Sequence, residues 1–165
     1  MARGCTLAHM GSCAALLAIV AIGAGCGASK SAVPAPRLTQ AAFVAKANAL
    51  CRAFDRQSKG LERRLRALGR RRDLEGTSLA LGEAIPSFRS AIYRLSRLRP
   101  PLRKEHTFRE LIRLLNKDLA YLRGAYKTLG TYDLESFLVL VRRAERVERR
   151  VQATARSLGL RACAA

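Results

Sequence analysis

Apolar residues recur every three or four positions through most of the chain after residue 38, which is the spacing of one face of an α-helix. Four such stretches, at 39–69, 73–98, 101–130 and 131–159, are separated by short breaks at glycine, proline or arginine. The last stretch has the most regular stripe: Phe137, Leu140, Ala144, Val147, Val151, Thr154 and Leu158. No run of β-branched residues alternates with a period of two, so no sheet is expected. The pattern predicts an all-α fold, an antiparallel four-helix bundle over residues 39–165.

Residues that favour helix ends lie at the breaks between these stretches. The candidates for N-caps, whose side-chain oxygens accept from the first free amides, are Thr39, Asp73 and either Thr131 or Asp133. Gly159 suits the position that follows the last helix. Pro86 lies inside the second stretch, where it predicts a kink or a restart of the helix.

Residues 1–25 have the layout of an export signal. Arg3 precedes an apolar run at 14–22, small residues follow at 23–25, and Cys26 comes next. The segment resembles the lipobox of bacterial lipoproteins, although Gly23 stands where an aliphatic residue is usual. The resemblance implies that residues 1–25 are removed and that Cys26 receives lipid. An ordinary secretory signal, which would release a free protein, is the first alternative. A buried hydrophobic helix is the second alternative. A retained transmembrane helix is not favoured, because the apolar run is shorter than the roughly 20 residues that span a bilayer.

Residues 26–38 are small and polar and include Pro34 and Pro36, a composition that disfavours helix. We predict that this segment is a flexible tether between the lipid and the helical domain.

The export signal assigns a role to each of the five cysteines. Cys5 and Cys13 leave with the signal, and Cys26 is the lipid acceptor, so Cys51 and Cys163 remain. Two cysteines in an oxidising compartment allow one intramolecular disulfide, which closes a loop of about 110 residues and contributes about 4–5 kcal/mol in the chain-entropy model. The alternative is two free buried thiols. No metal site is expected, because zinc needs two further ligands and only one histidine follows residue 25.

The chain is strongly basic, with 31 Lys and Arg residues against 12 Asp and Glu and a net charge of +19. One interpretation is a solvated surface without a specific ligand. The other is attraction to anionic lipids or envelope polymers. The candidate contacts on the fourth stretch are Arg142, Arg143, Arg146, Arg149 and Arg150. Nucleic acid is not an expected partner, because the protein is exported and no nucleic-acid-binding motif is present.

No catalytic constellation stands out, and neither a cofactor nor an enzymatic activity is expected. His106 is interpreted as a capping or solvent-facing residue. Asp118 is interpreted as a boundary residue paired with a nearby arginine, and no pair of inward-facing carboxylates is apparent. Acidic and basic residues four apart predict surface ion pairs. These pairs are Asp55 with Lys59, Glu62 with Arg66, and Glu145 with Arg149.

Two short segments resemble a known group of proteins. These are Asn48–Cys51, early in the first predicted helix, and Gly159–Cys163, near the end of the chain. They are similar to the small helical lipoproteins of unknown function found in high-GC Gram-positive bacteria. The resemblance implies the helical fold, an extracytoplasmic location and pairing of Cys51 with Cys163, and it carries no activity.

We therefore expect a lipid-anchored, non-enzymatic binding or scaffolding module on the outer face of the cytoplasmic membrane. Its expected partner is the membrane, through the lipid anchor. Anionic envelope polymers or another envelope protein are further candidates. The alternatives are a helical bundle that binds a small ligand and a secreted protein without lipid.

The lipid anchor has a direct test. Cells that express the protein are expected to incorporate radiolabelled palmitate into it, and the Cys26→Ala variant is expected to incorporate none, because it lacks the acceptor thiol. Absence of label from both proteins would contradict the anchor.

Overall fold

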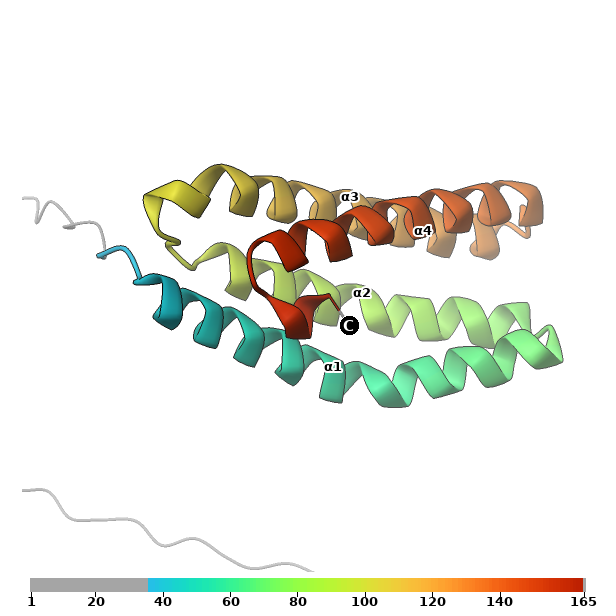
Figure 1. The fold of residues 1–165 in the computed structure, drawn as a ribbon. Coiled ribbons are helices and arrows are strands. Elements are labelled where there is room, and N and C mark those ends of the chain that lie inside the picture. The colour runs from blue at the N-terminus through green and yellow to red at the C-terminus, as the bar shows by residue number, and fades with distance from the viewer. Residues whose placement is uncertain (1–35, 165) are drawn as a thin grey trace, which may run out of the picture. The chain divides into compact units, whose positions relative to one another are not determined.

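Four long helices make up most of residues 36–164, the part of the chain that this computed structural model describes. They are α1 (Gln40–Arg71), α2 (Leu74–Ser96), α3 (Glu105–Gly130) and α4 (Leu134–Ser157). Two single turns of 3-10 helix, η1 (Leu102–Lys104) and η2 (Arg161–Cys163), precede α3 and follow α4. Consecutive helices run antiparallel, with α1 and α2 forming one pair and α3 and α4 the other (Figure 1). The predicted all-α four-helix bundle is confirmed.

Helices α1, α2 and α4 begin where the sequence places N-caps. The side chain of Thr39 accepts a hydrogen bond from the amide of Ala42 at 3.2 Å. Asp73 caps α2 in the same way, with 2.7 Å between its Oδ1 and the nitrogen of Gly76. Of the two candidates before α4, Asp133 is the cap. These side chains bond to amides that have no partner within the helix, which explains why such local signals are reliable.

Two details of the predicted helices are decided by the structure. Helix α2 continues through Pro86, so the helix does not restart there. In α4 the fully buried residue near the C-terminal end is Ala155, and Thr154 lies only partly buried beside it. Adjacent positions on a helix point about 100° apart, so the two side chains face different directions, and it is the Ala155 side of α4 that packs into the core.

The main hydrophobic core lies at the end of the bundle where α1 and α3 begin and α4 ends. Phe43 and Phe108 meet edge to face there, with ring centroids 5.2 Å apart. The largest fully buried side chains all belong to this cluster: Phe43, Leu111, Leu114, Leu158 and Leu160. A smaller cluster of Leu81, Ala125 and Leu129 lies at the opposite end, near the turns that join α1 to α2 and α3 to α4.

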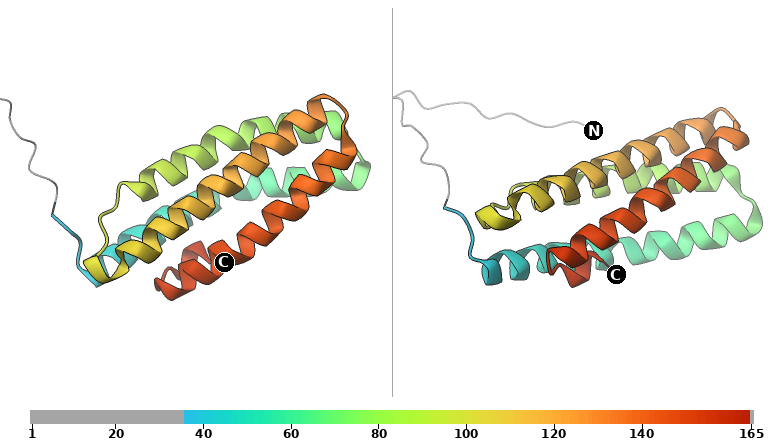
Figure 2. Two further views of the ribbon diagram at one scale, coloured as in Figure 1. Left: turned by 90° about the horizontal axis from the view of Figure 1, so that it is seen from above. Right: turned by 45° about the horizontal axis from the view of Figure 1, so that its top comes forward.

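The C-terminal tail closes the larger end of the bundle. The chain reverses at Gly159, whose φ of 81° favours glycine, and η2 then packs against both α1 and α4. Cys163 forms a disulfide with Cys51 of α1, as predicted, with 5.1 Å between the two Cα atoms. The amide of Ala162 also donates to the side chain of Asn48 at 2.8 Å. Figures 1 and 2 show the tail lying beside α1.

The N-terminal approach to α1 is also held in place. Arg37 forms an ion pair with Glu105 at 2.8 Å, and the amide of Leu38 donates to the carbonyl of Arg99 at 2.9 Å. The last residues of the predicted tether therefore contact the connection between α2 and α3.

The disulfide predicts a measurable contribution to stability. The bridge links residues 112 apart, so replacing both cysteines (Cys51→Ser with Cys163→Ser) is expected to lower the free energy of unfolding by about 4–5 kcal/mol. Urea denaturation of the residue 36–165 domain measures the loss, and reduction of the native protein should produce a similar one. Equal midpoints for the oxidised and reduced protein would contradict this expectation.

Candidate functional site

A groove opens between the two helix pairs at the end of the bundle opposite the disulfide. Its volume is about 790 Å³, and all four long helices contribute to its wall. The apolar side chains that line it are Leu65, Leu74, Leu81, Leu122, Ala125, Leu134, Phe137, Leu140, Val141 and Ala144. Most of these belong to the smaller core cluster or pack against it.

The groove exists because α1 and α4 do not approach each other along the described chain. No Cα atom of α1 lies within 8 Å of one in α4, and η2 separates the two helices at the other end. Helices α3 and α4, in contrast, pack closely. A Cβ atom at Gly124 would lie only 3.0 Å from Leu140 Cδ1, so glycine permits this approach. Small residues in the wall, such as Ala125 and Ala144, leave the space between the pairs unfilled.

A second opening of about 470 Å³ adjoins the groove and is bounded mainly by α1 and α2. Asp118, Leu122 and Glu148 line both spaces. Asp118 of α3 and Glu148 of α4 therefore lie where the two cavities meet.

Three carboxylates in the groove lack the partners that other acidic residues have. Asp118, Glu145 and Glu148 form no ion pair within residues 36–164, although Gln152 donates weakly to Glu148 at 3.5 Å. Five of the other acids pair with arginine or lysine: Asp55, Glu62, Glu83, Glu105 and Glu110. Two cap helices, Asp73 and Asp133, and two lie in first helical turns, Glu75 and Glu135. The groove thus holds the acidic residues that have no such role in the fold.

Burial changes the acidity of Asp118. Loss of hydration in its partly buried position is the main cause, and the negative charge of Glu148 adds to it, raising the pKa of Asp118 from 3.8 to about 6. Asp118 is partly buried, as expected of a boundary residue, but no arginine among the described residues pairs with it, so the predicted pairing is wrong. Glu148 of α4 is the charged group that acts on Asp118. Other acidic residues line the same two openings, among them Glu145 on α4, Glu62 on α1 and Glu83 on α2.

The other predicted surface pairs have mixed outcomes. Lys59 pairs with Asp55 at 3.1 Å, and Arg66 pairs with Glu62 at 3.8 Å. Glu145 and Arg149 form no ion pair within the described residues, and Glu145 lines the groove instead. Glu145 and Glu148 were not predicted to line a groove. Their signal is a second stripe, Val141, Glu145, Glu148 and Gln152, which advances by 4, 3 and 4 positions beside the apolar seam.

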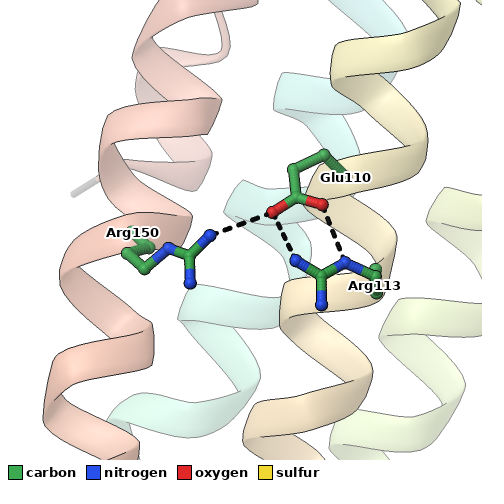
Figure 3. Close-up of polar contacts among 3 residues, drawn as sticks. All are labelled: Glu110, Arg113 and Arg150. Atoms are coloured by element: carbon green, nitrogen blue, oxygen red, sulfur yellow. Dashed lines mark hydrogen bonds and ion pairs between the residues drawn. The ribbon is translucent and has the colours of Figure 1, made fainter.

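The predicted basic contacts lie on a different part of α4. Arg142, Arg143, Arg146, Arg149 and Arg150 are all exposed. Arg150 reaches Glu110 of α3 at 3.3 Å, where Glu110 also binds Arg113 at 2.7 Å (Figure 3). The hydrogen bond and positive charge of Arg113, with Arg150, keep the pKa of Glu110 below its ordinary value. The other four arginines make no ion pair with the described residues.

The remaining points from the sequence concern Cys26, His106, metal binding and passage through a membrane. Cys26, the proposed lipid acceptor, lies outside the described residues, as does the predicted signal. His106 is exposed in the first turn of α3. Within residues 36–164, no three His, Cys, Asp or Glu side chains are placed to hold a metal ion. None of the helices in the same range has both the length and the apolar character needed to cross a bilayer.

Comparison of the chain with known protein families, with curated proteins and with solved structures returns no match. The groove and the charge distribution therefore carry the functional argument.

The raised pKa of Asp118 predicts a pH-dependent effect on stability. The folded protein binds this proton more tightly than the unfolded chain, so ionisation of Asp118 lowers stability as the pH rises from about 4 to about 6. Asp118→Asn is expected to raise the free energy of unfolding by about 1–2 kcal/mol at neutral pH, after allowance for partial solvent access. Near pH 4 the gain should disappear.

Urea denaturation at both pH values measures this effect. Asp55→Asn is the matched control, because it removes an aspartate charge that is exposed and paired with Lys59. A gain of the same size at both pH values would contradict the role assigned to Asp118.

Proposed function

We propose that residues 39–165 form a non-enzymatic binding domain and that its site is the groove between the helix pairs. The observation that supports this most strongly is the groove itself. Small-molecule sites in proteins are typically clefts of about 300–1,000 Å³ with mostly apolar walls and a few polar groups, and the groove has this size and lining.

The exposed apolar surface at the groove favours occupation by an apolar ligand. Leu134 lines the groove and is 46% exposed. Removing apolar surface from water is worth about 25 cal/mol per Å². A ligand with an apolar body therefore gains affinity by covering this wall.

The same proposal includes export and attachment to the membrane through Cys26. The lipobox-like segment supports it, as does the Cys51–Cys163 disulfide, since structural disulfides are typical of oxidising compartments. A secreted protein without lipid remains the alternative. In either case the domain would present the groove outside the cytoplasm.

A second candidate function is contact with anionic lipids or envelope polymers. The exposure of Arg142, Arg143, Arg146 and Arg149, without ion-pair partners among the described residues, favours it. Each basic group near an anionic membrane contributes about 1 kcal/mol of attraction. This surface would hold the domain at the envelope while the groove binds its ligand.

Binding in the groove is tested with the neutral apolar dye phenylnaphthylamine, which fluoresces when it leaves water. The native domain is expected to bind the dye with a Kd of about 1–10 μM. Ala144→Phe places a ring inside the groove and should weaken binding at least about tenfold. The matched control is Ala153→Phe, an exposed position on the same helix that lines no pocket described here.

Circular dichroism checks that both variants remain folded. If Ala144→Phe unfolds the domain, Val141→Trp, which enters the same groove from α4, replaces it. Equal dye binding by the native protein and a folded groove variant would contradict the proposed site.

A further inference from the structure

We propose that the groove binds an amphipathic organic cation, a molecule with an apolar body and an amine or quaternary ammonium group. This inference rests on the proposed ligand-binding function and adds the chemical class of the ligand. It is carried by the contrast between the charge of the groove and that of the whole protein.

The protein as a whole is basic, but the groove is acidic. Four acidic residues line it, Asp73, Asp118, Glu145 and Glu148, against a single basic residue, Arg72. The chain has 31 basic residues and 12 acidic ones, so a wall of random composition would be basic. An anionic ligand would therefore find more basic side chains on the rest of the protein than in the groove.

A cationic ligand would supply the ion-pair partner that the carboxylates in the groove lack. Nine of the twelve acidic residues pair with a basic side chain, cap a helix or lie in a first helical turn, and the other three line the groove. Asp118 is partly buried and faces Glu148 without a counter-ion among the described residues. An opposite charge close to a carboxylate in a site of low polarity stabilises the ionised form.

The placement of the carboxylates defines the shape of this ligand. Asp118 of α3 and Glu148 of α4 lie at the junction of the two openings. From there the apolar wall runs along α3 and α4 through Leu122, Ala125 and Phe137 toward the turns at the end of the bundle. A cationic group at the junction thus leaves an apolar body lying along the wall. A bare metal ion would use none of this apolar surface.

The inference is tested by competition with three amphiphiles that share a dodecyl chain and differ in the head group. Dodecyltrimethylammonium is cationic, dodecyldimethylamine oxide is neutral near pH 7, and dodecanoate is anionic. Each is added to the native domain with bound phenylnaphthylamine, at concentrations below its micelle concentration, and displacement of the dye is measured. The cation is expected to displace the dye at a concentration at least about tenfold lower than the neutral compound, and the anion should be the weakest competitor.

Two double variants, each of which removes two negative charges, test which carboxylates cause the preference for the cation. Asp118→Asn combined with Glu148→Gln removes two negative charges from the groove, and the preference for the cation over the neutral compound should fall to about twofold or less. Glu75→Gln combined with Glu135→Gln removes two charges outside the groove, in the first turns of α2 and α4, and should keep the tenfold preference. Circular dichroism confirms that both double variants are folded.

The outcomes separate this inference from the proposed function. If the dye binds but the three amphiphiles compete equally, or the anion competes best, the ligand class is wrong and the groove remains a binding site. If both double variants lose the preference equally, the carboxylates of the groove do not recognise the cation and the inference is overturned. A native dimer that Ala144→Phe converts to monomers would instead assign the groove to a second copy of the chain. If the dye does not bind the native domain, the proposed function itself fails.

Discussion

The attachment of the C-terminal tail to α1 is the constraint on which the rest of the structure depends. The Cys51–Cys163 disulfide and the hydrogen bond from Ala162 to Asn48 place η2 between α1 and α4. Leu158 and Leu160 fill the space at that end and become part of the main core. The tail therefore closes one end of the bundle and lies between α1 and α4, which it keeps apart.

The separation of α1 and α4 produces an asymmetric bundle. One end has a large packed core, and the other has a small cluster and a groove bordered by all four helices. Asp118 lies near the middle of α3, where the two openings meet and give its carboxylate some contact with water, so it can lie between the helices although it has no basic partner among the described residues. The result is a basic protein with an acidic, apolar groove, and this contrast suggests recognition of a cationic ligand with an apolar body.

The local features of the fold were predictable because each depends on residues close together in the chain. Thr39, Asp73 and Asp133 cap helices by bonding to amides three residues away. The apolar spacing predicted four helices, and short connections required them to run antiparallel. The disulfide was predicted from the number of cysteines that remain if the predicted export signal is removed. Helix α2 continues through Pro86, so of the kink or restart predicted there the restart does not occur. The burial of Ala155 rather than Thr154 was not predicted, because it depends on contacts with neighbouring helices.

The sequence by itself determined the helices, their caps and the two cysteines available for a bridge. Only the tertiary structure decided that Asp118, Glu145 and Glu148 line one cavity. Periodicity predicts which residues share a face of a helix, but it does not predict which flank of that face meets another helix. That choice depends on how α4 is rotated and how far it lies from α1, and both are consequences of packing between elements distant in the chain.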